Sequence, residues 1–129
     1  MIMGLFSWKK KKKLPEMLDI SAGQLEYLAE EAKNHTVKNV NEKCYIFGTE
    51  IMFDYNDKTH IIGVGYDKKR AKTENNMTFS EKYMTVYLDK EKYSTIEELF
   101  ENVKLDGKQI REIQSGIIVG TEYKSLLNI

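Results

Sequence analysis

The feature that most constrains this fold is a long stretch of strand-like alternation enclosed by two helix-like segments. Every second position is apolar or aromatic over residues 45–55, apart from Thr49, and again over residues 60–66, which is the two-residue period of a β-strand. The residues between these stretches, Asn56-Asp57-Lys58, favour a tight turn. The pattern therefore predicts an antiparallel hairpin at the centre of the chain.

Each helix-like segment begins with a capping box, in which a Ser is followed three residues later by Gln or Glu. The first box, Ser21 with Gln24, precedes apolar residues spaced as on one face of a helix, which predicts a helix from Ala22 to about Asn34. The second box, Ser94 with Glu97, precedes the same spacing. Its apolar stripe consists of Ile96, Leu99, Phe100 and Val103.

The remaining segments are shorter. Residues 67–76 are polar and basic and predict a loop. Residues 77–79 and 82–89 predict further strands. The strand at 82–89 has apolar residues on both faces, as an inner strand of a sheet does. Asp106-Gly107 predicts a turn, residues 108–113 a short helix and residues 117–120 a last strand.

Helices that bracket a run of strands, instead of alternating with them, are typical of an α+β fold. We expect a mainly antiparallel sheet of about four or five strands, with two or three helices packed on one face. The length of 129 residues suits one domain. We place this domain at residues 16–129, after a polybasic tail at residues 1–15.

Charge is unevenly distributed along the chain. The formal net charge is zero, but Lys9–Lys13 carry five of the 20 positive charges and all 20 acidic residues lie from Glu16 onward. The body therefore has 15 basic against 20 acidic residues, a net charge of −5. An acidic body disfavours binding to nucleic acid, whose phosphates must be neutralised, and suits a protein partner with positive charge.

The tail combines a short apolar patch with the lysine run: Leu5, Phe6, Trp8, Lys9, Lys10, Lys11, Lys12 and Lys13. Three interpretations stay open for it. The tail is a solvated appendage, a peripheral contact with an anionic membrane through its aromatics and lysines, or an arm for nucleic acid.

Compartment is indicated by cysteine usage and hydropathy. The single cysteine, Cys44, cannot form an intrachain disulfide, which fits a reducing cytosol. No apolar run approaches the roughly 18 residues that span a bilayer. We expect a cytoplasmic protein, either free or peripheral at the inner face of the membrane.

Motifs for catalysis are missing from the sequence. His35, His60 and Cys44 lack the spacing of a zinc site, and the glycines of Gly63-Val64-Gly65 precede no helix that would make a phosphate loop. We therefore expect a non-enzymatic protein with no cofactor and no bound metal. A small-ligand domain or an enzyme without a recognisable motif, using a pocket between sheet and helices, is the alternative.

Tyrosine is the other marked residue type, with eight copies. Tyrosines on adjacent strands support a sheet by packing against each other, yet tyrosine is also enriched at protein interfaces and stacks on bases. All three roles stay open. The tyrosines concerned are Tyr45, Tyr55, Tyr66, Tyr83 and Tyr87.

The stretch VYLDKEKYSTIEELFENVKLDGKQIREI contains an acidic TIEELFEN helix followed by LDGKQIREI. From Tyr87 to Ile113 it resembles the closing part of small immunity proteins from bacterial contact-dependent and other polymorphic toxin systems. The resemblance implies a stoichiometric binder that neutralises a cognate toxin by covering its active or substrate-binding surface.

The partner implied by that resemblance is a basic toxin domain. From charge and residue type we expect Glu97, Glu98 and Glu101 to steer the encounter, and Tyr83 and Tyr87 to act as buried anchors.

Overall fold

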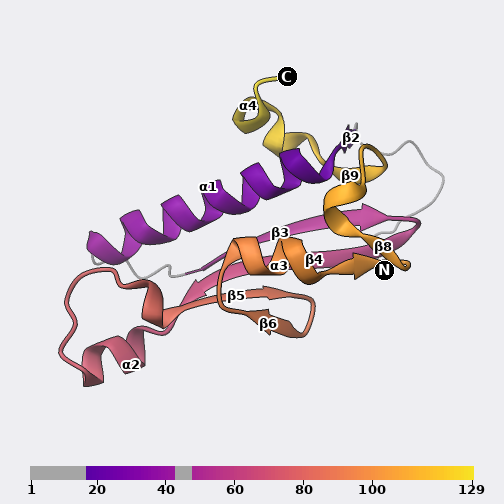
Figure 1. Cartoon of the computed structure of the whole chain (residues 1–129). Coiled ribbons are helices and arrows are strands. Elements are labelled where there is room, and N and C mark those ends of the chain that lie inside the picture. The colour runs from indigo at the N-terminus through magenta and orange to yellow at the C-terminus, as the bar shows by residue number, and fades with distance from the viewer. Residues whose placement is uncertain (1–16, 43–47) are drawn as a thin grey trace.

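A computed structural model of the chain describes residues 17–42 and 48–129. These residues form a six-stranded antiparallel sheet with helices (Figure 1), which confirms the α+β class with one strand more than the upper expected number. The predicted tail, Cys44 and Tyr45 lie outside the described residues. In sheet order the strands are β2 (Met17–Ile20), β9 (Ile117–Gly120), β3 (Gly48–Tyr55), β4 (Lys58–Tyr66), β5 (Met84–Leu88) and β6 (Glu91–Tyr93).

Four helices and a second, two-stranded sheet complete the described part of the chain. The helices are α1 (Ala22–Asn41), α2 (Lys68–Thr73), α3 (Ile96–Asn102) and α4 (Lys124–Leu127). The small sheet pairs β7 (Lys104–Leu105) with β8 (Lys108–Gln109). Single 3₁₀ turns form η1 (Glu81–Tyr83), η2 (Ile110–Glu112) and η3 (Thr121–Tyr123).

The predicted central hairpin is confirmed and is extended on both sides. β3 pairs with β4 from Gly48↔Gly65 to Tyr55↔Lys58, and β5 is an inner strand between β4 and β6, as predicted. The last strand, β9, lies between β2 and β3, with Leu18↔Val119 on one side and Asp54↔Ile118 on the other. The two ends of the domain are thereby joined in one sheet.

Helix α1 runs seven residues beyond the predicted end at Asn34. Its capping box forms as predicted, with the Ser21 N–H donating to Gln24 Oε1 at 2.9 Å. The helix continues because Thr36 and Asn39 extend the buried stripe with polar side chains, which an apolar pattern misses. The Thr36 hydroxyl donates to the Ala32 carbonyl at 2.9 Å, so its burial leaves no unpaired donor.

Two predictions about residues 67–79 are wrong. Residues 68–73 form helix α2 and not a loop, because the Asp67 side chain caps it by accepting from the Arg70 N–H at 3.0 Å. Residues 77–79 form no strand, and the next strand begins only at Met84.

The second capping motif lies one residue later than predicted. Thr95, and not Ser94, caps α3 by accepting from the Glu98 N–H at 3.0 Å, while the Glu98 carboxylate accepts from the Ser94 N–H at 2.6 Å. The predicted Asp106-Gly107 turn is confirmed and closes the β7–β8 hairpin. The predicted helix at 108–113 shortens to η2.

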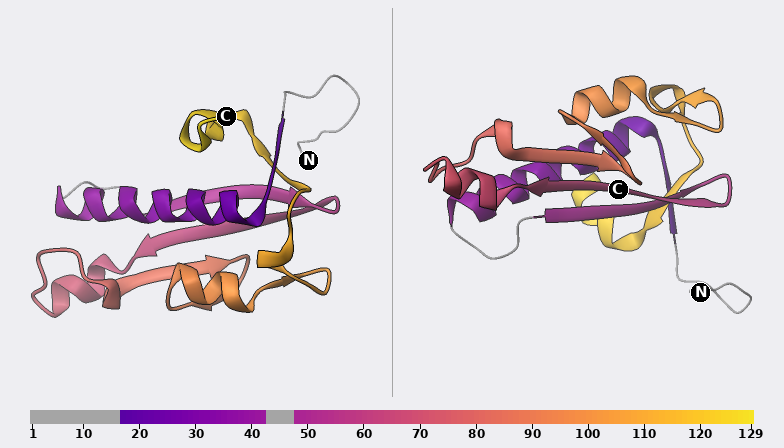
Figure 2. Two further views of the ribbon diagram at one scale, coloured as in Figure 1. Left: turned by 45° about the horizontal axis from the view of Figure 1, so that its top comes forward. Right: turned by 90° about the horizontal axis from the view of Figure 1, so that it is seen from below.

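The helices pack on one face of the six-stranded sheet, as predicted. Figure 1 shows α1 lying lengthwise over the sheet, and it packs against β3 and β4, while α3 packs against β5 and contacts α1. The views in Figure 2 place α2 at the end of the sheet nearest the C-terminal end of α1. No helix in residues 17–42 and 48–129 has the length and apolar character needed to cross a bilayer.

Candidate functional site

The sheet face opposite the helices is a candidate binding surface, and we call it the open face. Register and two-residue alternation place its side chains. Residues directly paired across strands share a face, as do Met52 with Ile61 and Asp54 with Ile118. The open face includes Met17, Asp19, Glu50, Met52, Asp54, Ile61, Gly63, Tyr87, Lys92 and Ile118.

An apolar stripe crosses the open face. Met52, on β3, is 58% exposed although its neighbours Ile51 and Phe53 are buried, and Met17, on β2, is 48% exposed. Ile118, on β9 between these two strands, is half-buried, and so is Ile61, which pairs with Met52 from β4. Exposed methionines on a sheet face are unusual enough to mark a candidate binding surface, because methionine adapts to varied partners.

Tyr87 lies across the open face towards β3. It pairs with Gly63, which in turn pairs with Glu50. A Cβ added at Gly63 would overlap the Tyr87 ring, so the glycine allows the ring to lie flat over β4. The Tyr87 hydroxyl donates to Glu50 Oε2 at 2.5 Å, and this hydrogen bond raises the pKa of Tyr87.

Four carboxylates flank the stripe: Asp19, Glu50, Asp54 and Glu122. Glu122 belongs to this set because its carboxylate lies over Gly120, on the open side of β9. Asp19 accepts from the Gly116 N–H at 2.7 Å and Asp54 from the Thr59 hydroxyl at 2.7 Å. Within the described ranges none of the four has an ion-pair partner. Among the described residues the open face therefore carries these four carboxylates against one lysine, Lys92, and is negative overall.

The residues expected to bind a partner are not brought together. Tyr87 lies on the open face, whereas Glu97, Glu98 and Glu101 lie on α3, behind the opposite face. Glu98 is used in capping α3, and Glu101 lies 3.6 Å from Arg111.

Tyr83 is 2% exposed, and burial takes its ring out of the accessible surface. Its hydroxyl donates to Glu74 Oε1 at 2.7 Å. Arg70 and Lys82 also bind Glu74, at 3.0 and 2.9 Å. The hydrogen bonds from Tyr83, Lys82 and Arg70 lower the pKa of Glu74 to about 2. This cluster fastens α2 to η1 and is structural.

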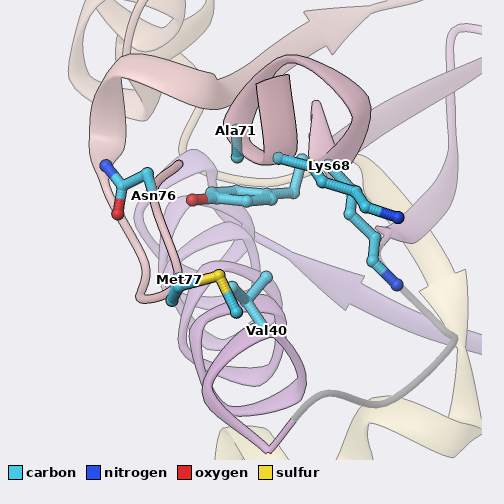
Figure 3. A pocket seen from close by; sticks show the side chains of 7 residues that line it. Val40, Lys68, Ala71, Asn76 and Met77 are labelled. Carbon is cyan, nitrogen blue, oxygen red and sulfur yellow. The ribbon is translucent and has the colours of Figure 1, made fainter. Parts of the chain in front are cut away.

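A cavity of about 250 Å³ lies beside α2 (Figure 3). It lies among the C-terminal end of α1, the end of β4, α2 and the loop that follows α2. Its lining residues are Val40, Tyr66, Lys68, Ala71, Lys72, Asn76 and Met77.

His60 lies on β4, away from the cavity. Its Nδ1 lies 2.8 Å from Asp89 Oδ2, and its ring stacks on Phe53 with centroids 5.2 Å apart. This pair lies six residues along β4 from Tyr66 and does not line the cavity. Among the residues that the structure describes, no cluster of three His, Cys, Asp or Glu side chains is placed to hold a metal.

Sequence reasoning missed most of the open face. The alternation of Glu50, Met52 and Asp54 along β3 was a usable signal, because these residues oppose the apolar positions of the same strand. The contributions of Met17 and Ile118 had no such signal, since β2 was not recognised and its pairing with β9 is long-range. No family model, no curated protein and no solved structure matches this chain.

Proposed function

We propose that this protein is a non-enzymatic binding module that docks a protein partner on the open face, in the manner of an immunity protein that neutralises a cognate toxin. One observation carries the proposal: an exposed apolar stripe, with Met17 and Met52 at its most exposed points, is flanked by carboxylates that have no ion-pair partner among the described residues. The partner that fits this surface presents apolar side chains flanked by lysines and arginines.

The two parts of the surface would contribute differently to binding. Covering the exposed methionines removes apolar area from water at about 25 cal/mol per Å², which favours a slow dissociation. The carboxylates act mainly on the encounter, because complementary charge accelerates association and loses its effect as salt rises. Binding to this face should therefore be tight at low ionic strength and should weaken with added salt through the association rate.

The resemblance of Tyr87–Ile113 to immunity proteins supports this class of partner. That segment forms the end of β5, β6, α3, the β7–β8 hairpin and η2. It supplies Tyr87 to the open face and the three glutamates of α3 to the acidic exterior. Under this proposal the α3 glutamates add to the negative field, and the contact itself is made by the open face.

The test is to immobilise the full chain and measure capture of the purified product of the adjacent gene. Met52→Lys places a charge at the centre of the stripe and should lower the affinity at least tenfold, because a buried lysine without a partner is costly. Met77→Lys is the matched control, since Met77 is also highly exposed, at 69%, but lies beside α2. It should bind like the parent chain.

Equal affinity for the parent chain and for Met52→Lys would remove the open face as the docking surface. An absence of binding by any neighbouring gene product would count against the immunity role. Circular dichroism of both variants checks that the fold is retained.

A second function is favoured by the tail sequence, with its aromatics beside five lysines. Peripheral association with an anionic membrane would need only that segment, and flotation with anionic vesicles tests it.

A further inference from the structure

We propose that residues 5–13 of the tail dock on the open face of their own molecule when no partner occupies it. Docked there, the tail would compete with the protein partner, and in that respect the proposal rests on the proposed function. The docking is tested on the chain alone and the proposed function with a partner, so the two can fail separately.

The tail has the composition that the open face would bind. The partner expected there presents apolar side chains flanked by basic ones, and residues 5–13 read LFSWKKKKK. Leu5, Phe6 and Trp8 suit the apolar stripe, and Lys9–Lys13 suit the carboxylates around it. The segment and the surface are therefore complementary both in apolar character and in charge.

The strand register places the start of the described chain within the apolar stripe. Met17 pairs with Gly120 on β9. Two residues along each strand from the Asp54↔Ile118 pair, Gly120 is level with Met52. The tail thus joins the domain in the row of the sheet that holds both exposed methionines.

Carboxylates lie near the point where the tail joins the sheet. Strand β2 starts level with Met52 and runs towards the row of Asp54, so its N-terminal end points towards the row of Glu50. Glu122 lies near the same end, over Gly120. Among the described residues these carboxylates have no ion-pair partner, so the lysines of the tail can pair with them without displacing another cation.

The chain between the tail and β2 is long enough for docking. At about 3.3 Å for each extended residue, Lys13 can lie up to about 13 Å from Met17 and Trp8 up to about 30 Å. Strands β2 and β5 are four strand spacings apart, or about 19 Å at about 4.8 Å for each spacing. The aromatic part of the tail can therefore reach the whole of the stripe.

Docking of this kind depends on salt. The described open face has four carboxylates against Lys92, and the tail brings five lysines to it. Each exposed ion pair contributes about 0.2–1 kcal/mol and weakens as salt rises. Because the tail is attached beside the stripe, its effective concentration at the surface is high. An anionic membrane attracts the same lysines, so an excess of such lipid should take the tail off the open face.

Trp8 can report on docking because it is the only tryptophan of the chain. The measurement is the quenching of its fluorescence by acrylamide, an uncharged quencher, in the full chain at low ionic strength. Quenching of Trp8 should be at least twofold weaker in the parent chain than in the Lys9–Lys13→Gln variant. Raising the salt to about 1 M, where the Debye length is about 3 Å, should remove this difference.

Met52→Lys tests the surface while leaving the tail unchanged. It places a charge in the stripe and should raise the quenching of Trp8 at least twofold above that of the parent chain. Met77→Lys is the matched control, since Met77 is 69% exposed but lies beside α2, and it should be quenched like the parent chain. In ¹⁵N-labelled protein, the amides that should differ between the parent chain and the Lys9–Lys13→Gln variant are those of residues 17, 50, 52 and 118.

Equal quenching of Trp8 in the parent chain and in Met52→Lys would overturn the proposal. Protection of Trp8 that grows with protein concentration would also overturn it, because the tail would then lie on a second molecule. Neither result bears on capture of a protein partner by the open face. Circular dichroism of both methionine variants checks that the fold is retained.

Discussion

Gly63 shows how one residue shapes the open face. The Tyr87 ring occupies the space that a Cβ at this strand glycine would need. The ring then reaches Glu50 on β3, two strands away. Tyr83, four residues earlier, is buried against Glu74 instead. Two tyrosines with the same apparent role in the sequence thus differ because Tyr87 lies on β5 at the open face, whereas Tyr83 lies in η1, before that strand begins.

We expect Glu74 to make the stability of the protein depend on pH. Its pKa falls from 4.5 to about 2 in the folded protein, so its contribution to stability is present above about pH 4.5 and is lost as the pH falls towards 2. Glu74→Gln should therefore destabilise the protein at pH 7, and the difference from the parent chain should shrink on acidification. Urea unfolding at several pH values measures this difference.

The control for Glu74 is Glu30→Gln, an exposed change on α1. It should leave the pH dependence of unfolding as in the parent chain. A Glu74→Gln difference that stays constant between pH 7 and pH 2.5 would show that the carboxylate does not stabilise the fold through its ionised form.

At the scale of elements, local signals located most helices and strands but not all of their ends. The α1 capping box and the Asp106-Gly107 turn are local features and were predicted correctly. The extension of α1 depends on burying Thr36 and Asn39 against the core, which no apolar pattern contains. Helix α2 was missed because a charged stretch was taken for a loop, although Asp67 was available to cap it.

In the β7–β8 turn, we expect the backbone conformation of Gly107 to contribute to the stability of the fold. Gly107 has φ +80°, and a Cβ there would meet no atom within 4 Å. Gly107→Ala should therefore lower the free energy of unfolding by about 1 kcal/mol through backbone strain alone. Gly107→Asn should cost less, because asparagine tolerates this conformation better. Thermal or urea unfolding measures both, and equal costs would show that the backbone conformation is not the cause.

At the scale of the whole molecule, the fold divides the surface into unlike parts. The helices cover one face of the sheet, and the other face exposes a methionine stripe with unpaired carboxylates around it in the described part of the chain. The basic helix α2 with its cavity lies at the end of the sheet, apart from that acidic face.

The polybasic tail would act on the whole molecule, by attaching it to a membrane surface. If it is a membrane contact, the full chain should bind vesicles that contain anionic lipid, with each lysine contributing about 1 kcal/mol. Replacing Lys9–Lys13 with Gln should abolish flotation with these vesicles. Met52→Lys, which alters only the open face, is the control and should float like the parent chain. Vesicle binding that survives loss of the five lysines would rule out this role.

By itself the sequence determined the α+β class, the central hairpin and the start of α1, because each depends on periodicity or capping within a few residues. Only the tertiary structure decided that β9 inserts between β2 and β3, that Tyr87 is accessible while Tyr83 is buried, and that Met17, Met52 and Ile118 share one surface. The physical reason is that strand order and face depend on pairings between distant segments. A local pattern fixes which residues alternate but not which strand they meet.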